Sequence, residues 1–205
     1  MPERIIHPQP AEGTKAADFF ESKIVVVSVT KEEFIKVVKN KYPEKKSEDI
    51  EQTKGINFEH NGQIIVLLRT DIFPEQYMPY FEIHEKWEAY IARKPGYNLF
   101  QKSVREYQRE KQADLHQDSD LQDFYRDIGV YNYEFRHELA VYKEYQQAML
   151  DGKLDEYHHW FMNLREKEKQ KADAKNLKLI ANDTEIRESI YRKLKDNSKH
   201  HFLRK

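Results

Sequence analysis

The chain has 205 residues, of which 39% are hydrophobic, 35% are charged and 13% are aromatic, and the aromatic content argues against a disordered chain. The absence of cysteine excludes disulfides, thiolate zinc sites and a cysteine nucleophile, and a net charge of −1 provides no general attraction to nucleic acid. Because neither a signal peptide nor an apolar run long enough to span a bilayer is visible, we expect a cytoplasmic protein with no membrane partner.

The first part of the sequence predicts an extended arm, a strand and a helix. Residues 1–22 contain three of the seven prolines and no hydrophobic periodicity, which is typical of an extended arm. Residues 23–29 form a β-branched run with the character of a buried strand. Thr30 and Glu33 follow at the spacing of a helical capping box. The predicted helix ends before Pro43, and its apolar positions are Phe34, Val37, Val38 and Tyr42.

Residues 56–69 give the clearest local signal in the sequence. Two β-type segments flank Asn61-Gly62, a dipeptide that tolerates the positive φ angles of a type I′ hairpin turn. The hydrophobic period then becomes helical from Phe73 to Ile91. Lys94-Pro95-Gly96 is expected to end this helix.

The hydrophobic pattern of all later segments predicts helices. Four helices are predicted over residues 99–115, 121–128, 133–150 and 154–174. A final helix would be capped by Asn182, Asp183 and Thr184, with Ile186, Ile190 and Leu194 on one face. We therefore expect an α+β fold, in which a small sheet with a β-hairpin packs on helices and a C-terminal helical subdomain follows. The predicted domains are an arm over 1–22, an α+β domain over 23–160 and a charged helical extension over 161–205.

The predicted helix that ends near Ile91 carries His-Glu-Lys-Trp-Glu at residues 84–88. Side chains four positions apart lie on one helical face, so His84 and Glu88 could bind one cation from adjacent turns. Glu85 would then lie beside the metal, where a carboxylate can take a proton from bound water. The alternative is a chance pattern, because the chain holds 36 acidic residues and nine histidines.

A second group of candidate ligands lies in the predicted helix over 133–150. Glu134, His137 and Glu144 share one helical stripe, so this helix could supply a third ligand to the first one. A metal with three protein ligands keeps an open position for water, as catalytic sites do. The alternative is a solvated charged face with a surface histidine, since charged side chains are usually exposed.

The order strand, helix, hairpin and then a helix that carries His-Glu resembles the minimal core of zincin metallopeptidases, in particular the gluzincin type. In this resemblance residues 62–68 take the place of the edge strand, and residues 80–89 take that of the active-site helix. The resemblance covers roughly residues 24–160 and rests on an H-E-x-x-E variant of the H-E-x-x-H motif. Glu88 stands where the family has a histidine.

The resemblance implies a metal-dependent hydrolase, a peptidase, that acts on a peptide or protein substrate. His84 and Glu88 would then be zinc ligands, and Glu85 the general base. The third ligand would be His137 or Glu144. Arg136 would orient a substrate carboxylate or support the charge of the transition state. Because Glu88 replaces a histidine, the resemblance leaves open a retained fold with altered or lost catalysis.

Two other functions fit the same residues. Glu134 and His137 have the E-x-x-H spacing of di-iron carboxylate bundles, in which the metal would be iron. Further ligands of such a site would be Glu85, Glu88 and Glu144. Those bundles normally carry two such motifs, and a hairpin has no place in them. The other function is a non-enzymatic protein-interaction module of the same fold, which would bind a partner through its aromatic surface or charged tail.

The remaining features predict exposed surfaces. Residues 163–205 hold 13 Lys and Arg against 7 Asp and Glu, and this mixture favours an exposed, ion-paired helix over a nucleic-acid surface. Adjacent side chains diverge by about 100° on a helix, so we expect His158-His159 and His200-His201 to be surface histidines rather than chelating pairs. The sequence has no glycine pattern for binding phosphate and no nucleophile-elbow motif.

Overall fold

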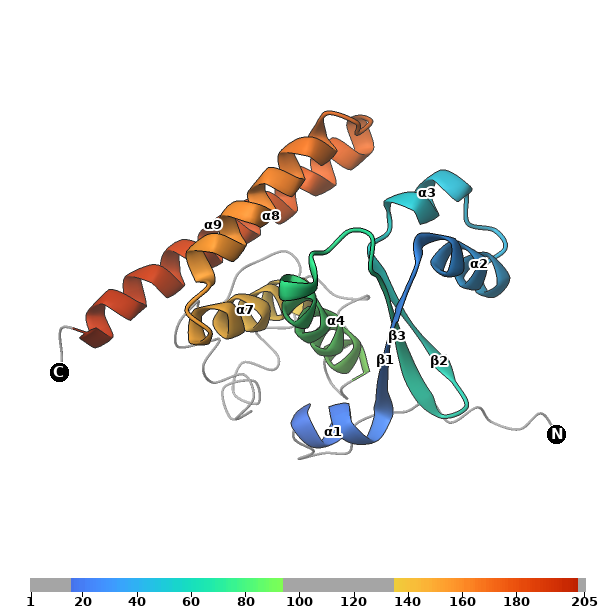
Figure 1. Cartoon of the computed structure of the whole chain (residues 1–205), viewed down its shortest axis with the longest axis horizontal. Coiled ribbons are helices and arrows are strands. Elements are labelled where there is room, and N and C mark those ends of the chain that lie inside the picture. The colour runs from blue at the N-terminus through green and yellow to red at the C-terminus, as the bar shows by residue number, and fades with distance from the viewer. Residues whose placement is uncertain (1–15, 94–134, 203–205) are drawn as a thin grey trace, which may run out of the picture. The chain divides into compact units, whose positions relative to one another are not determined.

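A computed structural model describes residues 16–93 and 135–202 of the chain (Figure 1). The chain divides into two compact units, residues 1–101 and 102–205. The described part of the first unit holds a three-stranded sheet with helices, and the described part of the second unit is helical. The predicted α+β class with a helical C-terminal part is therefore confirmed. The helices predicted over 99–115 and 121–128 lie outside the described residues.

The described part of the first unit begins with a helix and continues through strands and helices in mixed order. Its elements are α1 (Ala16–Lys23), β1 (Ile24–Val29), α2 (Lys31–Lys41), α3 (Ser47–Gln52), β2 (Gly55–His60), β3 (Gln63–Arg69), the 3-10 turn η1 (Glu75–Tyr77) and α4 (Met78–Arg93). The predicted capping box is confirmed, because the Thr30 side chain accepts from the Glu33 backbone and the Glu33 carboxylate accepts from the Thr30 backbone.

The three strands have the order β1-β3-β2. β1 runs parallel to β3, and β2 runs antiparallel to it. Asn61 (φ 49°) and Gly62 (φ 75°) join β2 to β3 in the left-handed conformations that a type I′ turn needs, so the predicted hairpin is confirmed. The zincin resemblance placed residues 62–68 at a sheet edge. That expectation is wrong, because β3 pairs with a strand on each side.

Two further expectations for this unit are corrected. Residues 16–22 belong to α1 rather than to an extended arm, because this helix buries Phe19 against the ring of Tyr90, with the centroids 5.4 Å apart. β1 is a strand with little buried surface rather than a fully buried one. Ile24 is buried, whereas Val27 is 37% exposed, as expected for a strand that pairs only with β3 among the described strands.

The two faces of the sheet pack against different helices (Figure 1). Ile56 pairs with Leu67, and both belong to the core that α2 and α3 form on one face. The core side chains from these helices are Phe34, Val38 and Ile50. On the other face Ile64, Val66 and Leu68 are fully buried, and α4 packs there. The Arg93 guanidinium ties α4 to β2 through the side chains of Asn57 (3.1 Å) and Glu59 (3.3 Å). The helix that carries His84 is thus held on the sheet.

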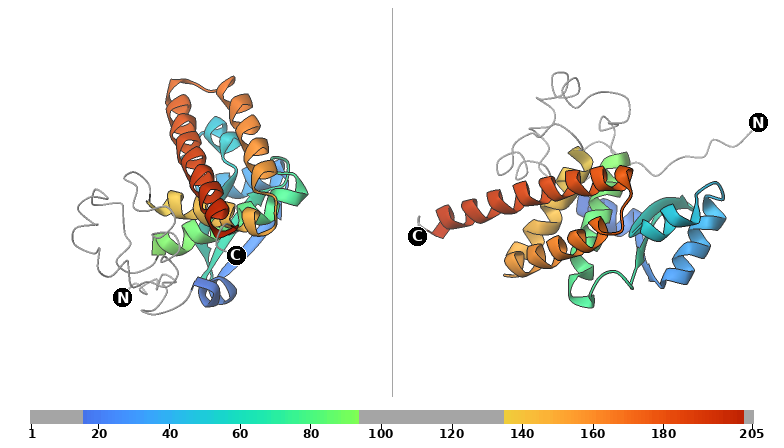
Figure 2. Two further views of the ribbon diagram at one scale, coloured as in Figure 1. Left: turned by 90° about the vertical axis from the view of Figure 1, so that its left-hand side faces the viewer. Right: turned by 90° about the horizontal axis from the view of Figure 1, so that it is seen from above.

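The described part of the second unit consists of α7 (Phe135–Leu150), α8 (Leu154–Lys169) and α9 (Ala174–Phe202). Gly152 has a φ of 71° just after α7, the left-handed conformation that glycine often adopts beyond the end of a helix. α8 and α9 lie side by side and antiparallel (Figures 1 and 2), and α7 packs against both. None of the described helices is both long enough and apolar enough to cross a membrane.

The last helix begins earlier than the sequence predicted. It starts at Ala174, because the carboxylate of Asp173 accepts the Asn176 backbone N–H at 2.8 Å and so caps the first turn. Residues 182–184 are therefore inside α9 and not at its start. Ile190 and Leu194 are buried on one face, as predicted. α9 packs with α7 as well as with α8, and all three of these helices belong to the second compact unit, residues 102–205.

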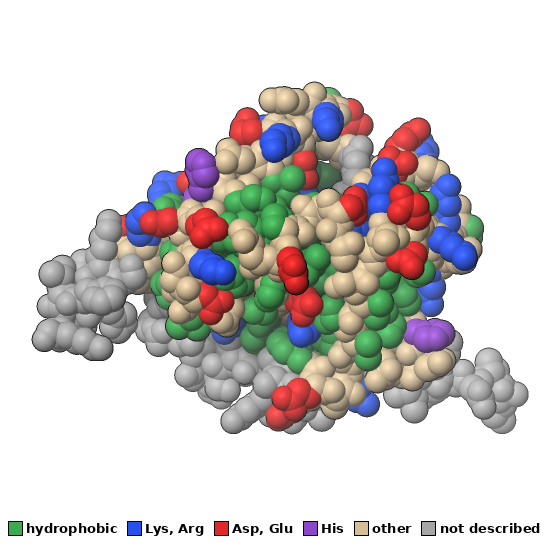
Figure 3. Space-filling view, viewed as in Figure 1, with side chains coloured by type: hydrophobic (Ala, Val, Ile, Leu, Met, Phe, Trp, Pro, Cys, Tyr) green, Lys and Arg blue, Asp and Glu red, His purple; other side chains and the backbone are tan. Residues whose placement is uncertain are grey.

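Basic and acidic side chains are interspersed over the visible surface of the described residues (Figure 3). On α8, Arg165 pairs with Glu168 at 2.6 Å, and Lys169 pairs with Glu166. Both pairs join residues three positions apart on one helix. The Lys169–Glu166 pair has the exposed, ion-paired character that the composition predicted, whereas Arg165 is only 11% exposed.

Candidate metal centre

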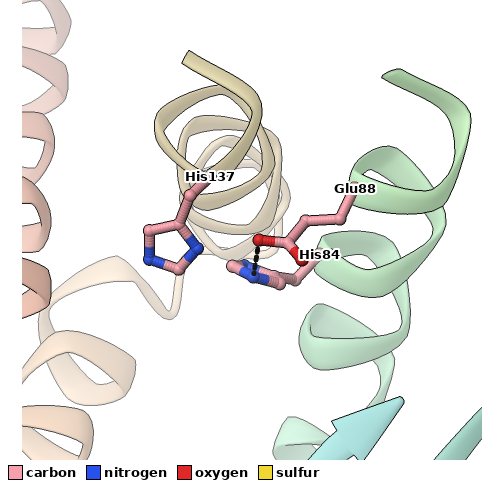
Figure 4. A group of neighbouring side chains, drawn as sticks. All are labelled: His84, Glu88 and His137. Carbon is pink, nitrogen blue, oxygen red and sulfur yellow. Dashed lines mark ion pairs between the residues drawn. The ribbon is translucent and has the colours of Figure 1, made fainter. Parts of the chain in front are cut away.

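His84 and Glu88 lie on successive turns of α4, and their side chains meet (Figure 4). The Nε2 atom of His84 is 3.3 Å from the Oε1 atom of Glu88. His84 is 4% exposed and Glu88 is 18% exposed. The imidazole also lies nearly parallel to the Phe81 ring, with the centroids 5.5 Å apart and the planes at 10°. The i, i+4 spacing and the stacked ring hold an imidazole and a carboxylate together in largely buried surroundings.

The distance between these two atoms suits a shared cation. Ligand atoms that each lie about 2.1 Å from a tetrahedral zinc ion are roughly 3.4 Å from one another. The 3.3 Å between Nε2 and Oε1 meets that requirement without a change of backbone, although a direct ion pair has the same spacing. One imidazole and one carboxylate also form a donor set that zinc accepts. The pair on α4 therefore fits part of a zinc site.

Glu85 is buried, with 7% of its surface exposed, and its carboxylate lies against β2. A Cβ atom built on Gly55 would be 3.1 Å from the Glu85 carboxylate and 2.9 Å from Cδ2 of Leu68. Glycine at the start of β2 thus leaves room for this acidic side chain between α4 and the sheet. The carboxylate is held close to the backbone of a strand, next in sequence to the His84–Glu88 pair.

The other predicted ligands belong to the second unit. His137, also labelled in Figure 4, comes from α7, and its Nε2 atom is 2.7 Å from Oδ1 of Asp183 on α9. Glu144 is fully buried on the same helix. It accepts a hydrogen bond from the Tyr157 hydroxyl and pairs with Arg187 at 2.7 Å. Glu134 lies outside the described residues, as does the side chain of Arg136.

A buried charge network in this unit was missed from the sequence. Asp183 accepts hydrogen bonds from the guanidinium groups of Arg165 and Arg187 as well as from His137. Arg187 is 1% exposed, and it also packs on the Phe161 ring with its Cζ atom 3.6 Å from the centroid. The one local signal was the i, i+4 spacing of Asp183 and Arg187, which the interpretation of Asp183 as a helix cap concealed.

Electrostatics keep this network ionised. Burial opposes the charge on Asp183, but Arg187, His137 and Arg165 together outweigh it and hold the pKa of this carboxyl well below its ordinary value. Burial likewise opposes the charge on Arg187, and Asp183 and Glu144 raise its pKa well above the ordinary value. Burial and the adjacent Glu144 raise the pKa of the Tyr157 hydroxyl. Tyr157 therefore remains a donor, and Asp183 and Arg187 remain charged at neutral pH.

His158 is buried, which corrects the prediction that both residues of the His158-His159 pair are on the surface. Its ring stacks on Tyr191 of α9 at 3.9 Å between centroids, with the planes at 2°. The Tyr145 hydroxyl lies 3.2 Å from Nδ1, and Glu188 lies 3.4 Å from Nε2. Only His159 of this pair is exposed. The structure does not describe the side chains of His200 and His201.

We expect the second unit to lose stability as the pH falls from about 7.5 through the ordinary histidine pKa of about 6.5. Burial lowers the pKa of His158, and this effect outweighs the opposing influence of Glu188. The unfolded chain therefore takes up a proton at a pH where the folded chain resists it, so stability falls as the pH decreases. The measurement is the free energy of unfolding in urea at several pH values. His158→Gln should have a flatter pH dependence than the parent, and an equal dependence in the two proteins would contradict this prediction.

No protein-family model, curated protein or solved structure matches this chain.

Proposed function

We propose that the protein is a metal-dependent hydrolase in which His84 and Glu88 bind a zinc ion. The reaction is the hydrolysis of a peptide bond in a peptide or protein substrate. The observation that supports this proposal is the His84–Glu88 pair. Two side chains that suit zinc are largely buried on one helical face, and their ligand atoms have the spacing of two ligands on one ion. The peptide substrate follows from the resemblance of the H-E-x-x-E helix to zincin metallopeptidases.

His137 is the third ligand in this proposal. The sequence left His137 and Glu144 as alternatives, and the contacts within the second unit favour the histidine. Glu144 is fully buried and already compensates the charge of Arg187, so its use as a ligand would disrupt an internal ion pair. His137 is 20% exposed and can bind a cation through an imidazole nitrogen.

Each residue then has a defined chemical role. A bound zinc ion would act as a Lewis acid that polarises a carbonyl group and makes a water molecule more acidic. His84 and Glu88 hold the ion, and Glu85 takes the proton from the attacking water. This role of Glu85 follows from the resemblance of the H-E-x-x-E helix to zincin metallopeptidases, and its side chain is buried, with the carboxylate beside β2.

Metal analysis of the purified protein tests the proposal. We expect close to one zinc ion per chain by mass spectrometry, and loss of that zinc in His84→Ala. Glu88→Gln keeps the size of the side chain and should weaken zinc binding by at least about 10-fold, because an amide oxygen is a poorer ligand than a carboxylate. His60→Ala, which removes an exposed histidine on β2, is the matched control and should retain zinc.

The same measurement separates the competing functions. Two iron ions per chain would favour the di-iron alternative. A parent protein that binds neither metal with micromolar affinity would contradict the hydrolase proposal and favour an interaction module. Circular dichroism on each variant shows whether α4 and the sheet remain folded, so that loss of metal is not mistaken for loss of structure.

A further inference from the structure

Asp183 holds the imidazole of His137 from a helix 46 positions further along the chain. Its Oδ1 atom is 2.7 Å from Nε2 of His137, and its Oδ2 atom accepts from Nε of Arg165 at 2.7 Å. Arg187 donates from Nε to both oxygens at 3.2 Å. Asp183 is 8% exposed, so this set of contacts is sheltered from water.

The two arginines determine which proton the histidine carries. A guanidinium group is always charged and donates only, so Asp183 between Arg165 and Arg187 is an ionised carboxylate that can only accept. The hydrogen bond at 2.7 Å must therefore take its proton from the histidine, at Nε2. In a neutral imidazole with the proton on Nε2, the lone pair that can bind a cation is on Nδ1.

We propose that Asp183 is a positioning residue that fixes His137 in the Nε2–H tautomer, so that His137 binds a divalent metal ion through Nδ1. This inference rests on the proposed function, in which His137 is the third zinc ligand. A carboxylate that accepts the second N–H of a ligating histidine fixes the ring orientation and raises the basicity of the ligating nitrogen. Arg165 and Arg187 in turn fix the position of the carboxylate.

The contacts that hold His137 come from the two helices that follow it in the chain. Arg165 comes from α8, and Asp183 and Arg187 come from α9. Arg187 also pairs with Glu144 on α7, the helix that carries His137. The three described helices of the second unit thus all contribute to the orientation of one imidazole.

The tautomer can be measured without metal or activity. In the ¹⁵N-labelled, metal-free full chain near neutral pH, we expect long-range ¹H–¹⁵N spectra to show a protonated Nε2 and an unprotonated Nδ1 for His137. His137→Gln identifies the signals by their loss. Addition of zinc sulfate should shift the Nδ1 resonance and leave Nε2 protonated. A metal-free ring protonated on Nδ1 would overturn the inference.

Asp183→Asn tests the positioning role directly. We expect about a 10- to 100-fold loss of zinc affinity, which is the usual effect of removing such a carboxylate. Asp155→Asn is the matched control, since Asp155 is an exposed carboxylate on α8 that pairs with Lys195, and it should bind zinc as the parent does. If Asp183→Asn loses its helical content, the tautomer of His137 measured in the parent protein tests the positioning role instead.

The outcomes distinguish this inference from the function on which it rests. If the parent chain binds no zinc, the proposed function fails, and the ligand role of His137 fails with it. If zinc binds but the His137 Nδ1 resonance does not move, His137 is not a ligand, and zinc binding through His84 and Glu88 stands. If a folded Asp183→Asn binds zinc as tightly as the parent, the positioning role is wrong and the metal site survives.

Discussion

Replacing Arg187 with methionine is expected to destabilise the helical unit by about 3–5 kcal/mol, which is the usual effect of removing one partner of a buried ion pair. Arg187 is 1% exposed and Glu144 is fully buried, so the carboxylate would lose its compensating charge in a place where water does not replace it. Asp183 would lose one of its two guanidinium partners as well. The measurement is urea unfolding followed by circular dichroism at pH 7.5.

The matched control is Arg192→Met, which removes an exposed arginine from the same helix and should change stability by less than about 0.5 kcal/mol. The double variant Glu144→Gln/Arg187→Met removes both charges of the pair and should recover part of the loss. If Arg187→Met is destabilised no more than Arg192→Met, the network does not hold the three helices together. If the double variant is no more stable than Arg187→Met, the cost arises from Asp183 or from packing on Phe161.

Local signals in the sequence predicted much of the fold. The capping box at Thr30 and the turn at Asn61-Gly62 involve only residues close in sequence, and the structure confirms both. α3 was missed because its stability comes from distant residues. Arg69 donates to the carbonyl oxygens of Glu51 (2.5 Å) and Thr53 (3.2 Å) at the end of this short charged helix, and Asp71 holds the guanidinium in place.

In the candidate site, too, contacts between residues close in sequence could be predicted and contacts between distant residues could not. His84 and Glu88 are one helical turn apart, so their contact could be predicted from spacing alone. Asp183 and His137 are 46 positions apart, and their contact depends on how α7 and α9 pack. His158 was predicted on the surface for a similar reason, because the ring that covers it comes from Tyr191 on another helix. Helical periodicity gives the face of a residue, but not which helix lies opposite that face.

Glu85→Gln is expected to lower kcat/KM for peptide hydrolysis by about 100- to 10,000-fold while the zinc content stays the same, because a glutamine cannot take the proton from water. The substrate for the assay is a set of fluorescence-quenched peptides that the parent protein cleaves. The substitution preserves the shape of the side chain, so its packing against Gly55 is kept and the sheet should remain intact.

A purely structural role for Glu85 gives a different result, because its carboxylate also fills the space beside β2. In that case Glu85→Gln would retain hydrolysis, and Glu85→Ala would mainly reduce stability through the cavity that it leaves. Gly55→Ala provides a second test of the catalytic role. Its added methyl group would lie 3.1 Å from the carboxylate and should displace it, so activity should fall while His84 and Glu88 still bind zinc. Full activity in both Glu85→Gln and Gly55→Ala would show that another group takes the proton.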